Sequence, residues 1–224
     1  MEIEKLLEEL EINYNNIKLY ERALTHTSYA NENRVESYER LEYLGDAVLE
    51  LVISDYMYKN TEYEEGKMTK YRSHYVCENA NYEYSTRLKL NDYLRLGHGE
   101  EERGGKYRKA IVADIFESFM GAMYLDLGFD VVKEFLYKHV IPLIENKNIE
   151  FFDDYKSVLQ ELVQTDKKSL EYVIVREDGP AHDKTFEVEV RIDNIVYGVG
   201  TAHSKKEAEQ LAACDALKKA QNTL

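Results

Sequence analysis

Hydrophobic and polar positions follow a helical period along most of the first 145 residues, most clearly from Tyr38 to Glu50, YERLEYLGDAVLE. At about 100° per residue, acidic side chains share one narrow arc of this helix and apolar side chains occupy the opposite side. The acids are Glu39, Glu42, Asp46 and Glu50, and the apolar residues are Leu41, Leu44, Val48, Leu51 and Val52. We therefore expect one packed face and one negatively charged face.

Like charges three or four residues apart destabilise an isolated helix by about 0.2–0.5 kcal/mol per pair. The acidic face is therefore either well solvated or neutralised by a cation. The pattern of this helix alone favours solvation, which is the common state of a charged face.

A second segment, Ala110 to Leu125, is almost entirely apolar but carries Asp114 and Glu117. Their i, i+3 spacing places both carboxylates on one side of a helix that otherwise belongs to the core. Ionised carboxylates in apolar surroundings are costly unless they are paired or bind a metal, and no Lys or Arg lies among them. The two acidic helices together therefore favour a metal site over a solvated surface.

The pattern changes after the polar stretch that ends at Asp153. A helix over Tyr155 to Thr165 precedes three alternating segments, LEYVIVRE, TFEVEVRID and IVYGVGTAH, and a last helix begins at Lys205. We predict a two-domain fold: an all-α domain over residues 1–147, a linker over residues 148–153 and an α+β domain of order α-β-β-β-α over residues 154–224.

The two acidic segments, ERLEYLGDAVLE and ADIFESFMGAMYLD, resemble the signature motifs of the ribonuclease III family. The resemblance extends through RALTHTSYANEN, LGHGEEERGG and the C-terminal third, so it covers nearly the whole chain. It implies an endonuclease that cleaves double-stranded RNA. The family's acidic residues match, one at a time, Glu39, Glu42, Asp46, Glu65, Asp114 and Glu117.

The resemblance also implies the chemistry of the site. Glu42, Asp46, Asp114 and Glu117 would be the principal metal ligands, with Asp46 and Glu117 catalytic. Glu39 and Glu65 would support a second ion or the RNA, and Glu50 would be structural. Oxygen ligands favour Mg²⁺, which Mn²⁺ could replace, and hydrolysis with two ions would leave 5′-phosphate and 3′-hydroxyl ends with short 3′ overhangs. Processing and decay of rRNA and mRNA is the expected role.

A homodimer is implied in the same way, because each chain of the family contributes one cutting site. The signature helix would form the seam between the chains. Gly45 would permit close backbone approach, and Tyr43 would project towards the partner. For both residues, packing within the core of one chain is an equal alternative.

The last helix opens with the sequence SKKE. Ser204 can cap this helix, and Glu207 can complete a capping box. Lys205 and Lys206 then lie in the first turn, where cations oppose the helix dipole unless the helix start meets phosphate. A phosphate contact is one interpretation, and two solvated lysines are the other.

The C-terminal segments resemble the double-stranded-RNA-binding domain, in which the first helix, the loop between the first two strands and the start of the last helix contact one face of the duplex. Gln160 and Glu161 match the first helix, and His182 lies in the loop DGPAHDKTF. The SKK segment matches the start of the last helix. One departure is Ala202, where the family pattern has a glycine.

Composition limits the possibilities. The chain has 224 residues and a net charge of −14, which is unexpected for a nucleic-acid enzyme. Residues 154–224 have a net charge of only −3, so the excess lies with the acidic helices, where divalent ions would offset part of it. Two distant cysteines, Cys77 and Cys214, indicate neither a disulfide scaffold nor a zinc site. With no apolar run long enough to span a membrane and no signal peptide, a cytoplasmic protein is expected.

Other interpretations remain open from the sequence. A duplex-RNA-binding regulator without cleavage would need an inactive site, although every expected carboxylate is present. A hydrolase of a small phosphorylated substrate would leave the RNA-binding motifs without a role. His26 is expected to be structural, and the basic residues Arg103, Lys106, Arg108 and Lys109 could either meet RNA or remain solvated.

Overall fold

The computed structural model describes residues 2–146, 155–165, 168–180 and 184–221. The chain divides into two compact units, residues 1–151 and residues 152–224. The first is built of helices, and the second combines two helices with a three-stranded sheet, which confirms the predicted fold class. The predicted linker, residues 148–153, lies outside the described residues.

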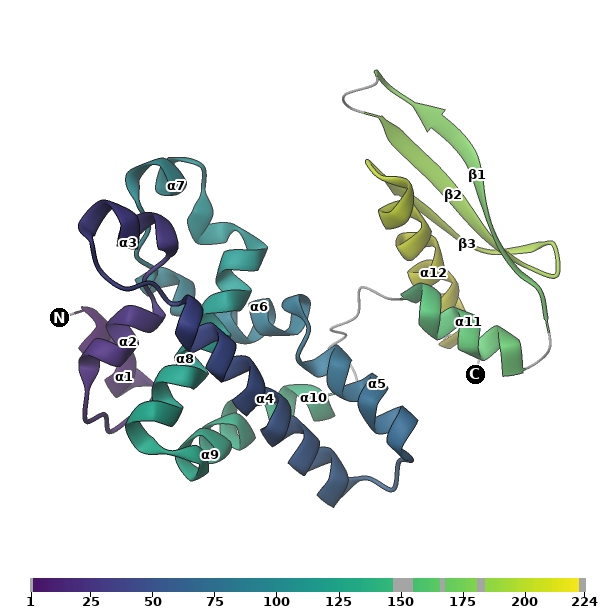
Figure 1. The fold of residues 1–224 in the computed structure, drawn as a ribbon. Coiled ribbons are helices and arrows are strands. Elements are labelled where there is room, and N and C mark those ends of the chain that lie inside the picture. The colour runs from purple at the N-terminus through teal and green to yellow at the C-terminus, as the bar shows by residue number, and fades with distance from the viewer. Residues whose placement is uncertain (1, 147–154, 166–167, 181–183, 222–224) are drawn as a thin grey trace. The chain divides into compact units, whose positions relative to one another are not determined.

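The helices of the first unit are joined by short loops (Figure 1). In chain order they are α1 (Glu2–Glu9), α2 (Ile17–Ala23), α3 (Thr27–Asn33), α4 (Glu39–Asn60), α5 (Glu65–Tyr75), α6 (Glu78–Arg87), the 3₁₀ turn η1 (Leu90–Tyr93), α7 (His98–Glu102), the 3₁₀ turn η2 (Gly105–Tyr107), α8 (Lys109–Leu127), α9 (Phe129–His139) and α10 (Ile141–Glu145).

Helix α8 is the centre of this unit. Most of its residues between Ile111 and Met123 are buried, and α2, α4, α6 and α9 pack against it. Phe116, Phe119 and Met120 are fully enclosed. An apolar helix covered on several sides gains stability from burial along its whole length, so the acids that it carries are held in a fixed frame.

Helices α4 and α8 cross at two glycines. A Cβ added to Gly45 would lie 1.7 Å from the carbonyl oxygen of Glu117, and one added to Gly121 would lie 2.2 Å from that of Leu41. Both positions therefore exclude any side chain. The backbones meet directly, and this contact brings the acidic residues of the two helices to the same crossing.

The packed face of α4 differs from the predicted one at its edge. Leu41, Val48 and Val52 are buried as expected, but Leu44 is only partly buried and Leu51 is 56% exposed. The buried arc is centred on Gly45, the point of closest approach to α8. Leu44 and Leu51 are rotated away from that contact, so the expectation that they pack in the core with the others was wrong for Leu51.

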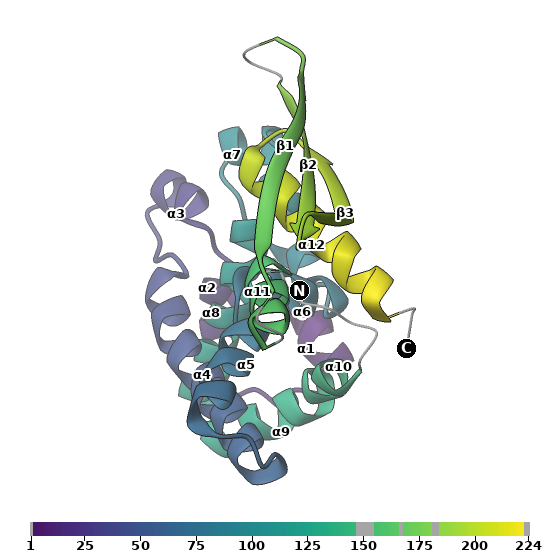
Figure 2. The same cartoon turned by 90° about the vertical axis from the view of Figure 1, so that its right-hand side faces the viewer.

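The second unit contains α11 (Tyr155–Thr165), β1 (Leu170–Asp178), β2 (Thr185–Ile192), β3 (Ile195–Ala202) and α12 (Lys205–Gln221). The strands form an antiparallel sheet in the order β1-β2-β3. Side chains of β2 are alternately buried and partly exposed, which is the pattern of a sheet with one packed face. Figure 2 shows α12 against this sheet, with α11 near it.

Small residues allow α12 to lie close to β3. Ala208, Ala212 and Ala216 face the strand, and a Cβ on Gly198 or Gly200 would lie within 2.3 Å of the helix backbone. The departure at Ala202 has a simple explanation here. Ala202 is a buried residue of β3 paired with Phe186, so its extended backbone needs no glycine.

Candidate active site and RNA-binding surface

Four carboxylates lie around the crossing of α4 and α8. Glu42 and Asp46 come from α4, and Asp114 and Glu117 come from α8. Glu117 is influenced by the charges of the other three, and Glu42 by those of Asp114 and Asp46. Residues about 70 positions apart in the sequence thus form one electrostatic cluster, which the crossing of the two helices creates.

Burial is the main cause of the unusual ionisation of these groups, and like charges are the second. Burial, reinforced by Asp46, Glu42 and Asp114, raises the pKa of Glu117 to about 8. Burial and neighbouring carboxylates likewise raise the pKa of Glu42 to about 7. Burial also raises the pKa of Asp46 and of Asp114, and no lysine or arginine of the described chain opposes these shifts.

Each acid of α8 accepts a hydrogen bond from a neutral donor on another element. The hydroxyl of Tyr38, the residue that precedes α4, donates to Asp114 Oδ2 at 3.0 Å. The side-chain amide of Asn81, on α6, donates to Glu117 Oε1 at 2.6 Å. Neither donor was predicted from the sequence. Tyr38 borders the signature motif, but no pattern in the sequence marks Asn81.

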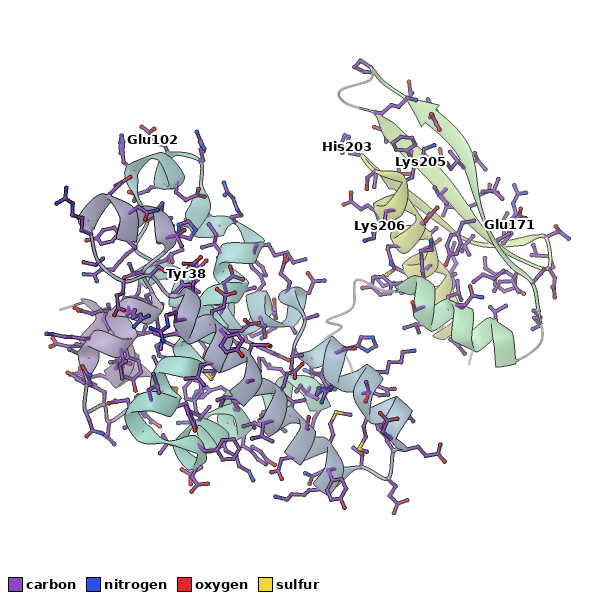
Figure 3. All side chains as sticks on the ribbon, in the orientation of Figure 1. Tyr38, Glu102, Glu171, His203, Lys205 and Lys206 are labelled. Atoms are coloured by element: carbon purple, nitrogen blue, oxygen red, sulfur yellow. The ribbon has the colours of Figure 1, made fainter. Side chains whose placement is uncertain are left out.

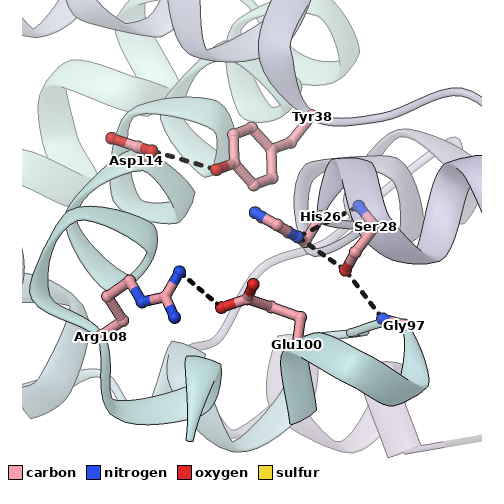
Figure 4. A network of polar contacts seen from close by, with 7 residues as sticks. All are labelled: His26, Ser28, Tyr38, Gly97, Glu100, Arg108 and Asp114. Atoms are coloured by element: carbon pink, nitrogen blue, oxygen red, sulfur yellow. Dashed lines mark hydrogen bonds and ion pairs between the residues drawn. The ribbon is translucent and has the colours of Figure 1, made fainter. Parts of the chain in front are cut away.

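Tyr38 also borders a polar network, drawn in Figure 4. Its ring lies beside that of His26, with 5.8 Å between the ring centroids. His26 accepts a hydrogen bond from the backbone amide of Ser28 and so caps α3, which is the structural role expected for it. In the same network, Arg108 forms an ion pair with Glu100 at 2.8 Å.

The basic run before α8 is partly used inside the domain. Besides the ion pair of Arg108 with Glu100, Lys106 approaches Asp92 at 3.1 Å. Ion pairs at the surface of a domain contribute little stability, but they orient the side chains that form them. These two residues therefore act as local links of the loop, whether or not RNA also meets them.

The two supporting acids lie in different places. Glu39 accepts a hydrogen bond from the Ser37 hydroxyl at 2.9 Å. Its negative charge contributes to the raised pKa of Glu42. Glu65 begins α5 and lines a small cavity with Ser54 and Tyr58. Ser54 lies eight residues beyond Asp46, which corresponds to about 12 Å along the axis of α4. The cavity that Glu65 lines is therefore that far from Asp46 in the direction of the helix axis. Of these two acids, therefore, only Glu39 lies with the cluster of its own chain.

The donor set suits a hard divalent cation, because all four ligand candidates offer carboxylate oxygens and their charges are uncompensated. In the described part of the chain, no three Asp, Glu, His or Cys side chains are already arranged as metal ligands. The case for a divalent cation therefore rests on the oxygen chemistry of these carboxylates and on their closeness to one another. Glu42 and Asp46 accept no hydrogen bond from another described side chain in this structure. Ordinary rotation of these two side chains can therefore bring their carboxylates towards a shared cation.

Tyr43 and Gly45, the two residues predicted for a dimer seam, lie in different surroundings, one exposed and one buried. Tyr43 is 83% exposed. Gly45 is buried against α8 of its own chain, so the close approach that the structure shows is the core-packing alternative. Tyr43 is accompanied by other exposed residues on the same side of α4, and we call this set the outer stripe: Tyr43, Ala47, Leu51 and Tyr58.

In the second unit, cations gather at the start of α12 (Figure 3). The Ser204 hydroxyl accepts a hydrogen bond from the backbone amide of Glu207 at 3.2 Å, which confirms the predicted cap. Lys205 and Lys206 follow in the first turn and are exposed. Lys205 lies 3.2 Å from Glu177, at the end of β1, so the helix start and the β1–β2 hairpin are neighbours.

The remaining predicted RNA contacts are only partly described. Gln160 is an exposed residue of α11. The N-terminal turn of this helix adjoins α12, because the backbone amide of Lys156 donates to the Gln210 side chain at 3.0 Å. His182 and the side chain of Glu161 lie outside the described residues. The surface that the structure describes thus runs from α11 to the start of α12.

The helical domain carries clustered carboxylates, and the small domain carries cations at the start of a helix. This combination is typical of a nuclease coupled to an RNA-binding module. The Ribonuclease-III-like family model matches residues 16–144, and the Double-stranded RNA binding motif matches residues 155–220. The chain therefore belongs to the ribonuclease III family, the endoribonucleases that act on double-stranded RNA.

Relatives of known name agree with this assignment. Ribonuclease 3 of Oceanobacillus iheyensis is 47% identical over 228 residues, which cover all of both chains. Ribonuclease 3 of Halalkalibacterium halodurans is 48% identical over 96% of this chain and 83% of its own. The solved nuclease domain of ribonuclease III from Campylobacter jejuni is 34% identical, with a TM-score of 0.59, over 62% of this chain and 96% of that domain. That nuclease domain shows structural flexibility in a region involved in its dimer formation.

Among the helices of the described ranges, none has both the length and the apolar character that crossing a lipid bilayer requires.

Proposed function

We propose that the protein hydrolyses phosphodiester bonds of double-stranded RNA with the help of divalent cations held by Glu42, Asp46, Asp114 and Glu117. The observation that carries this proposal is the uncompensated carboxylate cluster at the crossing of α4 and α8. Glu42, Asp114 and Glu117 are half-buried, and neighbouring carboxylates add to the burial that raises the pKa of Glu42 and of Glu117. Such a cluster is a poor structural element, because the repulsion between its charges is unfavourable. It forms a good cation site for the same reason.

The ions are Mg²⁺, with Mn²⁺ as a substitute, because hard oxygen ligands favour these metals. When bound, they supply activation of water and stabilisation of charge on the phosphate. Asp46 and Glu117 are the catalytic residues of the set. Glu39, beside Glu42, supports a second ion or the RNA, and Glu65 contacts the RNA, since it lies apart from the cluster of its own chain.

The C-terminal domain holds the duplex. Lys205 and Lys206 meet phosphates together with the backbone amides of the first turn of α12, and Ser204 keeps that turn in place. Gln160, Glu161 and His182 contact the minor grooves, where 2′-hydroxyls distinguish RNA from DNA. Binding of this kind depends on the shape of the helix more than on its sequence.

Two copies of the chain act together, and each cuts one strand. The outer stripe on α4 is the surface proposed for the contact, with Tyr43 as its most exposed residue. Exposed tyrosine and leucine side chains in a row are costly in water and favourable against a second apolar surface. The products carry 5′-phosphates and 3′-hydroxyls with short 3′ overhangs. The cellular role is processing and decay of rRNA and mRNA in the cytoplasm.

The test is cleavage of an end-labelled perfect RNA duplex in Mg²⁺, with matching reactions that contain chelator or the Glu117→Gln variant. The proposal expects short products with 5′-phosphates that require both the metal and Glu117. Binding of the duplex without cleavage, in Mg²⁺ and in Mn²⁺, would instead leave a duplex-RNA-binding protein. Cleavage by Glu117→Gln at the wild-type rate would contradict the assignment of that residue.

A further inference from the structure

The two α8 acids of the cluster, Asp114 and Glu117, are held by donors that the reaction itself does not call for. Asp114 is bonded to Tyr38 at 3.0 Å, and Glu117 is bonded to Asn81 at 2.6 Å. The donors come from the start of α4 and from α6, so they approach α8 from two different helices. Each takes one oxygen of its carboxylate and leaves the second oxygen available.

Asn81 occupies a buried position where a polar side chain destabilises the fold, so its bond to Glu117 is the feature that accounts for it. Its side chain is 1% exposed, and its Oδ1 atom has no hydrogen-bond partner among the described residues. A buried polar atom without a partner destabilises a fold, and an apolar residue of similar size would avoid that cost. The amide nitrogen bonds Glu117 and, more weakly, the Val76 carbonyl at 3.3 Å.

Tyr38 is placed in a similar way. Its ring is 4% exposed among the core residues of the first unit, and only its hydroxyl reaches the acidic cluster. A phenylalanine would fill the same space. The hydroxyl therefore adds one feature to the core, a hydrogen bond to Asp114.

Both donors are neutral, which distinguishes them from the partners that buried acids usually have. A lysine or arginine at either position would orient the carboxylate but would also cancel its charge. A phenol and an amide fix the direction of a carboxylate while its negative charge remains. Fixed direction with retained charge is what a cation-binding ligand needs, because hydrogen bonds to ligands orient them towards the metal.

We propose that Tyr38 and Asn81 are positioning residues that aim the carboxylates of Asp114 and Glu117 at the divalent cations. This inference rests on the proposed function, since it presumes that these acids are ligands. It assigns no chemical step to either residue. Their effect is on the affinity of the site for metal and, through it, on the rate of cleavage at limiting metal.

The variants are Tyr38→Phe and Asn81→Leu, each in the full-length chain. The matched control is Tyr20→Phe. Tyr20 is also fully buried, and its hydroxyl donates to another α8 carboxylate, Asp126 Oδ2, at 3.1 Å. This control removes the same kind of bond from the same helix, at a residue about two and a half turns beyond Glu117.

Calorimetric titration of the RNA-free proteins with Mn²⁺ is the first readout. Loss of either bond is expected to weaken Mn²⁺ binding by about ten-fold, and Tyr20→Phe to leave it unchanged. The second readout is the Mg²⁺ concentration at half-maximal cleavage, which should rise by a similar factor, with most of the maximal rate recovered at high metal. A purely structural role would change stability in all three variants and shift neither metal curve.

The outcomes separate the inference from the proposed function. If the wild type binds no Mn²⁺ and cleaves without metal, the proposed function fails. If the wild type binds Mn²⁺ and Tyr38→Phe and Asn81→Leu bind it equally well, the positioning role is overturned. Circular dichroism reports whether each variant is folded. Should Asn81→Leu unfold, Asn81→Ala cannot overpack the site and makes the same prediction for the metal curves.

Discussion

Gly45 and Gly121 face each other at the crossing of α4 and α8, where a Cβ on Gly45 would lie 2.8 Å from the backbone nitrogen of Gly121. This contact sets the distance between the helices that carry the acidic cluster. Backbone-to-backbone packing of this kind cannot yield to a side chain by rotation, because neither partner is a flexible group.

Replacement of Gly45 with alanine should therefore destabilise the first unit by about 3 kcal/mol or more, since the added methyl would overlap the Glu117 carbonyl. Thermal and urea unfolding would measure the loss. Gly66→Ala is the control, because Gly66 lies in α5 with nothing within 4 Å of the added Cβ, and it should raise stability slightly. Equal stability of Gly45→Ala and the wild type would mean that the helices can separate without cost.

The metal-free protein should lose stability as the pH rises from about 5 to about 8. The pKa of Glu117 is raised by burial to about 8, so the folded state holds a proton that the unfolded state releases near pH 4.5. Folding is thus favoured at the acidic end of this window and disfavoured at its upper end. Urea unfolding in chelator at several pH values measures the slope.

Glu117→Gln should reduce that slope, because a neutral amide replaces one carboxyl group, while Glu42, whose pKa is raised to about 7, keeps part of it. At about pH 8 the variant should be more stable than the wild type by roughly 1–3 kcal/mol, less than the full shift implies since water still reaches the side chain. Glu101→Gln on exposed α7 is the control and should retain the wild-type slope. A slope unchanged in Glu117→Gln would place the titrating group elsewhere.

Metal binding near neutral pH should release protons. The pKa values of about 7 for Glu42 and about 8 for Glu117, both raised first by burial, leave these groups partly protonated, and a cation binds only the ionised form. Titration calorimetry with Mn²⁺ in buffers of different ionisation enthalpy should report a release of roughly one proton at pH 7. Affinity should rise with pH up to about 8. Binding independent of pH and buffer would count against these two ligands.

Lys205→Ala/Lys206→Ala should weaken duplex-RNA binding several-fold and reduce its dependence on salt. Each phosphate contact contributes close to one unit of slope when the logarithm of affinity is plotted against that of salt, so a decrease of about one to two units is expected. Fluorescence anisotropy at several salt concentrations measures both effects. Lys218→Ala, at the other end of α12, is the control. If both variants weaken binding equally, the helix start has no special role.

Tyr43→Glu should convert a dimer to a monomer at micromolar concentration, because an ionised side chain within an apolar contact would be desolvated without a partner. Analytical ultracentrifugation measures the state. Tyr107→Glu is the control, since Tyr107 is similarly exposed, at 72% against 83% for Tyr43, but lies outside the outer stripe. A wild type that sediments as a monomer would exclude the proposed arrangement.

Local pattern was enough to predict the elements of both domains. The helical period around Glu42 and Asp46, the apolar run that carries Asp114 and Glu117, and the alternating strands after Leu170 correspond to α4, α8 and the sheet of the structure. The cap formed by Ser204 was also predictable, because capping depends on residues within one turn.

The sequence by itself determined the two-domain fold, the family and which acids are candidate ligands, since periodicity, capping and motif spacing are local properties of the chain. Only the tertiary structure decided that Gly45 packs against α8 of its own chain, that Leu51 is exposed, and that Glu65 lies apart from the cluster. It alone revealed the bond from Asn81 to Glu117, 36 residues away. Such contacts depend on how helices cross, and a crossing is fixed by the packing of the whole domain rather than by any single segment.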